Sequence, residues 1–283
     1  MLLVALTTGC IKEDLDSCDT NLIFRYFGDG TKDIFPEKIE KVDMYVYSEN
    51  GALVETIGLN QGDLRNNQGT PLNLPAGKYW VVGWGNTKND TQINQAAALN
   101  TALVAAPHYF TKEIITTNDS LYIGSRDIEI FQDASNTDTV YFSSSHIKMY
   151  LELDGLEEMA MAGGTSPIEI EVGNLSPTVD FAKTFSSENV SYKPVVQKEG
   201  NTSGFKSRFN VLRFNNNNGI YINLVSKETN KTIYTLNLKD FMQDNRITVD
   251  GINEVTVGIR FRFNGTSVTV LPWDEEVIKP GLG

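Results

Sequence analysis

Cys10 is the residue whose surroundings point to the most specific chemistry in this sequence. A short apolar run, Leu2 to Leu6, is followed by Thr7-Thr8-Gly9 and then by this cysteine. Small residues directly before a cleavage point are typical of a processed export signal, and the thiol of a cysteine at that point can carry acyl chains such as palmitate. The pattern predicts a lipoprotein signal peptide over residues 1–9 and lipidation at Cys10.

The residues on either side of Cys10 refine this prediction. The apolar run is too short to span a bilayer, which takes roughly 20 residues. No Lys or Arg precedes it, so we expect a signal peptide whose start is either truncated or misassigned. Lys12-Glu13-Asp14 opens an acidic stretch that resembles the signal for lipoprotein export to the cell surface of Bacteroidota. We therefore expect residues 10–20 to form an acidic lipidated tether on the outer membrane. An ordinary apolar N-terminus of a cytosolic protein is the alternative.

Other residues that could carry chemistry are few. The chain has only two cysteines and two histidines: Cys10, Cys18, His108 and His146. This set makes a zinc site of nitrogen and sulfur ligands improbable. The sequence contains no Gly-x-Ser-x-Gly, no His-Glu-x-x-His and no phosphate-binding glycine loop. Acidic runs such as Asp274-Glu275-Glu276 could supply the carboxylates of a glycosidase, but adjacent acids on an acidic protein are usually solvated surface. We expect no enzymatic activity, no cofactor and no metal.

The charge balance argues against a nucleic-acid partner. Lys and Arg number 24 against 36 Asp and Glu, which gives a net charge of −12. Nucleic acid is bound by clustered cations that neutralise phosphates, whereas this balance is typical of a solvated surface. The length of 283 residues favours about two domains.

Strand-like runs bounded by Gly, Asn, Asp and Pro recur along the chain, as in sandwiches and barrels. Lys41 to Tyr47 alternates apolar and polar residues, which predicts a strand with one buried face. Asn50-Gly51 predicts a tight hairpin turn after it, and 216–219 and Asn264-Gly265 predict two more. Ile93 to Ala106 is rich in alanine and leucine and is expected to form a short helix, and 239–244 a helical turn.

Ser143-Ser144-Ser145 is the best candidate linker between two such β-rich halves. We therefore expect an N-terminal β-sandwich over residues 21–145 and a C-terminal β-sandwich over residues 146–283, the second ending in a possible donor strand or tail.

Four motifs cover most of the first half and both ends of the chain. They are Asp14-Leu15-Asp16-Ser17-Cys18 with Leu22 to Tyr26; Ile39 to Tyr47 running into Asn50-Gly51; Leu74 to Tyr79 with Trp84-Gly85-Asn86; and Val268 to Trp273. In these motifs the chain resembles the Bacteroidota fimbrillin superfamily and, within it, the FimB-type fimbrial anchor lipoproteins of type V pili.

The resemblance implies an all-β fold of two tandem transthyretin-like antiparallel β-sandwich domains in a structural subunit of a cell-surface fimbrium. In stalk subunits of that superfamily, a protease cleaves after an arginine and removes the first strand, and the C-terminal segment of a neighbouring subunit fills the groove. An anchor keeps its lipid and its first strand and ends the fibre at the membrane. The implied partners are other fimbrial subunits, through strand exchange, and the outer membrane, through lipid on Cys10. Stalk and tip (adhesin) roles are the alternatives.

Candidate residues can be named for strand exchange and for cleavage. A foreign strand can satisfy unpaired backbone groups and fill an apolar slot at a sheet edge. The candidate donor residues are Ser267, Val268, Thr269, Val270, Leu271, Pro272 and Trp273. This segment could equally complete its own sheet, and the tail 274–283 is a second candidate donor. Arg25 and Arg65 are candidate maturation sites, and two ordinary surface or strand-end arginines are the alternative.

A polysaccharide-binding surface lipoprotein is the main competing interpretation. Trp80, Trp84 and Trp273, with Tyr79, could form an aromatic platform for sugars. Alternation along the strand that contains Tyr79 to Trp84 instead favours core packing for one aromatic set. Two or more of these rings that are coplanar and exposed would favour sugar binding.

Overall fold

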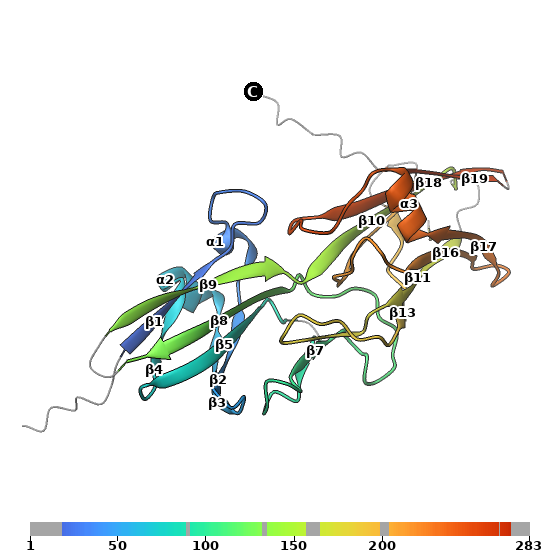
Figure 1. Ribbon diagram of the computed structural model, residues 1–283. Helices are drawn as coiled ribbons and strands as arrows, with labels where there is room; N and C mark the ends of the chain where they lie inside the picture. The colour runs from blue at the N-terminus through green and yellow to red at the C-terminus, as the bar shows by residue number, and fades with distance from the viewer. Residues whose placement is uncertain are drawn as a thin grey trace, which may run out of the picture.

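A computed structural model describes residues 19–88, 91–131, 135–156, 165–198, 204–265 and 267–272. These residues form two β-sandwiches arranged end to end (Figure 1), which confirms the expected all-β fold. Cys10, Trp273 and the tail 274–283 lie outside the described residues. Within the described part of the chain, no helix is long and apolar enough to cross a membrane.

The first sandwich is built from one sheet that folds over on itself, in the order β3-β2-β5-β8-β9-β1-β4. Its elements are β1 (Asp19–Arg25), α1 (Phe35–Lys38), β2 (Val42–Ser48), β3 (Leu53–Leu59), α2 (Gln61–Asn66), β4 (Gly69–Asn73), β5 (Gly77–Gly85), β8 (Tyr122–Ile130) and β9 (Asn136–Ser144). The fold-over occurs at β9, whose first part pairs with β1 and whose last part pairs with β8. Phe24 and Leu72 from one layer thereby share a buried core with Val42 and Val81 from the other.

The second sandwich packs two sheets face to face, in the orders β14-β15-β10-β18-β19 and β13-β11-β16-β17. Its elements are β10 (His146–Asp154), β11 (Ile168–Leu175), β13 (Val190–Tyr192), β14 (Gln197–Lys198), β15 (Phe205–Leu212), β16 (Tyr221–Ser226), β17 (Thr232–Asn237), α3 (Leu238–Asp244), β18 (Thr256–Asn264) and β19 (Ser267–Pro272). Leu151 and Ile259 of the first sheet meet Ile170 and Leu224 of the second in one apolar cluster.

Both sandwiches use their first strand in the same way. β1 pairs antiparallel with β4 and parallel with β9, the last strand of its sandwich. β10 likewise pairs antiparallel with β15 and parallel with β18. The two sandwiches therefore repeat the same pairing of the first strand, although the sequence has no repeat of fixed period.

A small sheet of β6 (Gln92–Asn94), β7 (Leu103–Ala105) and β12 (Thr178–Asp180) joins the two halves. The helix expected over Ile93 to Ala106 is wrong, because this segment contains β6 and β7. Ala102 and Val104 are buried in a cluster that also holds Trp84 of β5 and Phe181 of the second half. Burial in this cluster and pairing with β12 outweigh the helix propensity of alanine and leucine.

Two of the three expected hairpin turns are confirmed. Gly51 joins β2 to β3 with φ +80° and Gly265 joins β18 to β19 with φ +63°, a left-handed conformation that glycine adopts without strain. The expectation for 216–219 is wrong, because this segment connects β15 to β16, which belong to different sheets. The expected helical turn at 239–244 is α3.

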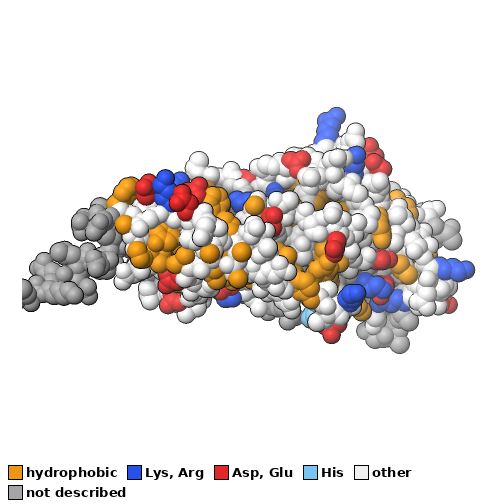
Figure 2. Space-filling model, turned by 60° about the horizontal axis from the view of Figure 1, so that its bottom comes forward, with side chains coloured by type: hydrophobic (Ala, Val, Ile, Leu, Met, Phe, Trp, Pro, Cys, Tyr) orange, Lys and Arg blue, Asp and Glu red, His pale blue; other side chains and the backbone are white. Residues whose placement is uncertain are grey.

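Figure 2 shows one face of the molecule. Apolar side chains gather over the first sandwich on this face, and positively and negatively charged side chains are mixed across it.

Candidate functional site

The first strand, β1, is an interior strand that links the edge strand β4 to β9. Leu22 and Phe24 are 1% and 0% exposed and point into the core. β4 approaches β1 so closely at Gly69 that an added Cβ would lie 1.8 Å from the carbonyl oxygen of Leu22. Removing β1 would therefore open a groove between β9 and β4 and expose apolar core positions.

Arg25 lies at the end of β1 and is fixed there. Its Nη1 donates to Oδ2 of Asp33 over 2.7 Å, and Asp33 also accepts hydrogen bonds from the backbone of Tyr26 and from Gln68. Burial opposes ionisation of Asp33, but the bonds from Arg25, Tyr26 and Gln68 outweigh it and lower the pKa of this carboxyl. The residue after Arg25, Tyr26, is 1% exposed.

Arg65 lies in the last turn of the short helix α2 and its side chain is exposed. The helix begins with a capping box in which Asn60 and Asp63 satisfy each other's backbone N–H groups. A chain break after Arg65 would separate β1, β2 and β3 from the rest of the sandwich, and β2 is an interior strand.

The candidate donor residues Ser267 to Pro272 form β19, which pairs antiparallel with β18 from Asn264↔Ser267 to Ile259↔Pro272. Val268 and Val270 are partly buried against the core of the second sandwich, whereas Ser267 and Thr269 are exposed. Among the described residues, β19 has no strand on its other side. The structure thus brings this segment into its own sheet as an edge strand.

A polar cluster around Glu254 joins the two sandwiches. Its Oε1 accepts hydrogen bonds from the hydroxyls of Tyr26 and Tyr122 over 2.6 and 3.3 Å. Its Oε2 accepts from Nζ of Lys38 and Lys148 over 2.8 and 2.9 Å. Tyr26, Lys38 and Tyr122 belong to the first sandwich. The carboxylate is therefore shared between the halves.

The backbone beside Glu254 strengthens this contact. Asp29, in the loop after β1, accepts hydrogen bonds from the backbone N–H groups of Asn253 and Glu254 over 2.7 and 2.8 Å. The side chain of Asn253 donates to the carbonyl of Gly28 and accepts from the N–H of Ser144. Together with the sheet of β6, β7 and β12, these bonds fix the orientation of the two sandwiches.

Glu254 and His146, both at this joint, have displaced pKa values. Burial opposes the charge of Glu254, but the hydrogen bonds from Lys38, Tyr26 and Lys148 outweigh it and lower its pKa from 4.5 to about 2. Burial lowers the pKa of His146 from 6.5 to about 4, so this imidazole is neutral near pH 7. Its Nδ1 lies 2.9 Å from the carbonyl oxygen of Leu121.

We expect Glu254→Gln to destabilise the fold by about 1.5–3 kcal/mol at pH 7, because hydrogen bonds to a charged group are lost. The folded-state pKa of Glu254 lies below its unfolded value, so its contribution is present above pH 4.5 and is lost as the pH falls toward 2. The variant should lose this pH dependence. It should still lose stability as the pH falls from 6.5 to 4, because His146 is neutral in the folded state and becomes protonated more easily in the unfolded chain. Urea unfolding at a series of pH values measures both effects.

The matched control is Glu228→Gln, which removes an exposed carboxylate in the loop between β16 and β17. It should change the free energy of unfolding by less than about 0.5 kcal/mol. Equal stability of the Glu254→Gln variant and the wild type at pH 7 would contradict the role given to this cluster.

The aromatic platform considered for sugar binding does not form from the described aromatic residues. Trp84 is fully buried, with its ring centroid 5.8 Å from that of Phe181. Trp80 is half-buried on the same face of β5, and Tyr79 packs on the opposite face, against the core of the first sandwich. Core packing, the favoured interpretation, is confirmed for Trp84.

Sequence reasoning missed Glu254 and Asp29. Glu254 lies 228 positions from Tyr26 and no motif surrounds it. Asp29-Gly30 carried a usable signal, since an acid beside glycine after a strand is typical of a turn whose side chain caps backbone N–H groups.

The sequence matches the family described as fimbrillin-A associated anchor proteins Mfa1 and Mfa2 over residues 15–279. No curated protein matches it significantly.

Several solved structures share the fold. A proposed polysaccharide-binding protein from Bacteroides thetaiotaomicron superposes with a TM-score of 0.73 at 14% identity, over 92% of this chain and 99% of that one. A proposed adhesin from Bacteroides ovatus gives 0.69 at 17% identity, over 92% and 97%. The fimbrial anchor protein Mfa2 from Porphyromonas gingivalis gives 0.66 at 15% identity, over 90% and 98%. At these identities the likeness establishes the fold alone.

Proposed function

We propose that this chain, which belongs to the family of fimbrillin-A associated anchor proteins, is the lipid-anchored base subunit of a cell-surface fimbrium. In this role it carries acyl chains on Cys10, remains on the outer membrane and ends the fibre by strand exchange with the next subunit. Stalk and tip positions in the same fibre are the alternatives.

The observation that carries the proposal is the integration of β1 into its sheet. β1 is hydrogen-bonded on both sides, to β9 and β4, and supplies buried side chains to the core. The peptide bond after Arg25 leads into the buried Tyr26, and Arg25 is tied to Asp33. A subunit that keeps its first strand has no open groove for a further subunit, as an anchor requires.

The position of β1 also suits a tether. The start of β1, blue in Figure 1, lies at the end of the first sandwich that is remote from the second. Eight residues lie between Cys10 and Asp19, and the nine steps along the chain, at up to 3.6 Å each, allow a reach of about 30 Å. A lipidated Cys10 would hold the first sandwich at the membrane and leave the second pointing outward.

The second sandwich, which would then point away from the membrane, carries the candidate donor strand β19. β19 follows β18 through a two-residue turn, and releasing it from β18 would free alternating side chains, with Val268 and Val270 on one face. Such a strand could fill the slot of a stalk subunit that has lost its first strand. The tail after Pro272 is the second candidate for this role.

Deleting the gene in a fimbriate strain tests the proposal. We expect fibres to be released into the medium or to grow longer, because nothing ends them at the membrane, and electron microscopy with fibre antigen in cell and medium fractions measures both. The protein should co-purify with the fibre base. Fibres of normal length that stay on the deleted strain would contradict the anchor role.

A further inference from the structure

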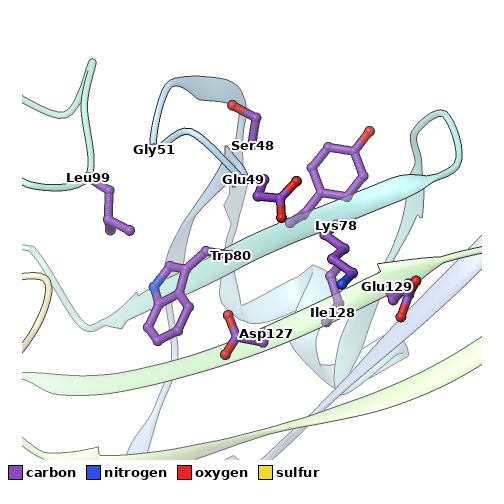
Figure 3. A pocket seen from close by; sticks show the side chains of 10 residues that line it. Ser48, Glu49, Gly51, Lys78, Trp80, Leu99, Asp127, Ile128 and Glu129 are labelled. Carbon is purple, nitrogen blue, oxygen red and sulfur yellow. The ribbon is translucent and has the colours of Figure 1, made fainter.

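A cavity of about 510 Å³ lies on the outer face of the first sandwich, and its lining residues belong neither to β1 or β19 nor to the cluster around Glu254. Its floor is formed by β5 and β8 and its rim by the turn after β2 and the loop that contains Leu99 (Figure 3). The volume falls within the range of about 300–1,000 Å³ typical of small-molecule sites.

The register of the sheet places an aromatic ring beside polar side chains in this cavity. Trp80 of β5 lies directly opposite Asp127 of β8, and Lys78 lies opposite Glu129. Residues opposite each other in an antiparallel pair share a face of the sheet. Figure 3 shows Trp80 and Asp127 on one side of the hollow and Ser48 and Glu49 on the other.

The walls of the cavity are fixed by backbone contacts. The N–H of Leu99 donates to the carbonyl of Gly51 over 2.9 Å, and Ala52 forms a bridge with Ala98. Trp80 packs against the buried cluster that contains Tyr47, Val82 and Trp84. A ligand would therefore meet a largely preformed site.

The charged side chains of the cavity are not used by the described part of the fold. Glu49, Lys78, Asp127 and Glu129 make no ion pair and no side-chain hydrogen bond with the part of the chain that the structure describes. Lys78 and Glu129 form no ion pair with each other, although they face each other across the strands. These carboxylates and this ammonium group are free to bind a ligand that offers several hydroxyl groups.

We infer that this cavity is a binding site for a neutral saccharide. The indole of Trp80 offers an apolar surface to the C–H face of a sugar ring, while Asp127, Glu129 and Glu49 accept hydrogen bonds from hydroxyls and Lys78 donates one. Three carboxylates against one ammonium group repel acidic sugars and phosphates. The inference concerns the first sandwich alone and does not depend on the position of the subunit in the fibre.

Saturation-transfer NMR on the full chain carrying Cys10→Ala tests this site, with cellobiose, lactose, maltose and chitobiose as neutral probes. We expect at least one neutral disaccharide to bind, and 3′-sialyllactose to bind at least tenfold more weakly than the neutral probe. Trp80→Ala should weaken binding at least tenfold, and Trp80→Phe less, since it keeps an aromatic face.

Asp127→Asn is the second variant. Asp127 is exposed and makes no hydrogen bond or ion pair with the described residues, so the fold should be unaffected. It should also weaken binding, while Asp244→Asn, which removes an exposed carboxylate at the end of α3, should leave binding unchanged. Three results would each overturn the inference. The first is absence of saturation transfer to every neutral probe, and the second is binding that Trp80→Ala and Asp127→Asn leave unchanged. The third is binding of a trilysine peptide in place of the sugars.

Discussion

Replacing Cys10 by alanine is expected to release the protein from the cell envelope. The share of the protein in the membrane fraction should fall more than tenfold, and fibre antigen should move from cells to medium. Each acyl chain on the thiol contributes about 0.8 kcal/mol per buried CH₂ group, and stable anchoring takes more than one chain. Without the thiol no chain is attached, so nothing opposes dissociation. Immunoblots of membrane, periplasmic and medium fractions measure the distribution.

Cys18→Ala is the matched control, because it removes the other thiol eight positions further along the same stretch. It should leave the protein on the membrane and the fibres on the cells. If the Cys10→Ala variant stayed in the membrane fraction with its fibres attached, lipidation of this residue could not be the anchor.

Trp84→Ala should destabilise the protein by about 3–5 kcal/mol, the cost typical of emptying a large aromatic site in a core. Trp84 is 0% exposed and lies in the cluster that joins β5 and β7 of the first half to Val179 and Phe181 of the second. The empty space left by the missing indole would therefore weaken the packing between the two sandwiches as well as the packing within the first sandwich. Urea unfolding of the soluble Cys10→Ala chain measures the change in free energy.

Trp84→Phe is the control for this prediction. The indole nitrogen of Trp84 is buried and has no hydrogen-bond partner among the described residues, so phenylalanine removes volume without breaking a hydrogen bond. We expect it to cost less than about 1.5 kcal/mol. A cost for Trp84→Ala below that of Trp84→Phe would show that the cluster does not stabilise the fold.

Local sequence patterns predict the strands and tight turns of this protein well. Lys41 to Tyr47 alternates in sequence, and β2 alternates buried and half-buried side chains over most of its length. Asn50-Gly51 and Asn264-Gly265 form the expected hairpins because the turn conformation depends on those residues themselves.

Patterns that depend on distant contacts are predicted less well. Ile93 to Ala106 has helix-forming residues, yet β7 within it pairs with β12, which lies more than 70 residues further along the chain. The turn at 216–219 has the right residues for a hairpin, but long-range pairing assigns its flanking strands to different sheets.

The same distinction between local patterns and distant contacts applies to the candidate site. The position of Ser267 to Pro272 as a strand follows from its alternation and its turn, whereas its place beside β18 is one of two outcomes that the sequence allows. Glu254 could not be found from sequence, because its partners Tyr26, Lys38 and Lys148 are brought to it only by the packing of the two halves.

The mass of the N-terminal peptide of the protein taken from cell envelopes tests the anchor role most directly. The account predicts a chain that begins at an acylated Cys10 and continues uncut through Asp19 to Arg25, so that β1 stays in its sheet. A chain that begins directly after Arg25 or Arg65 would contradict it, since that subunit would have lost both its lipid and its first strand.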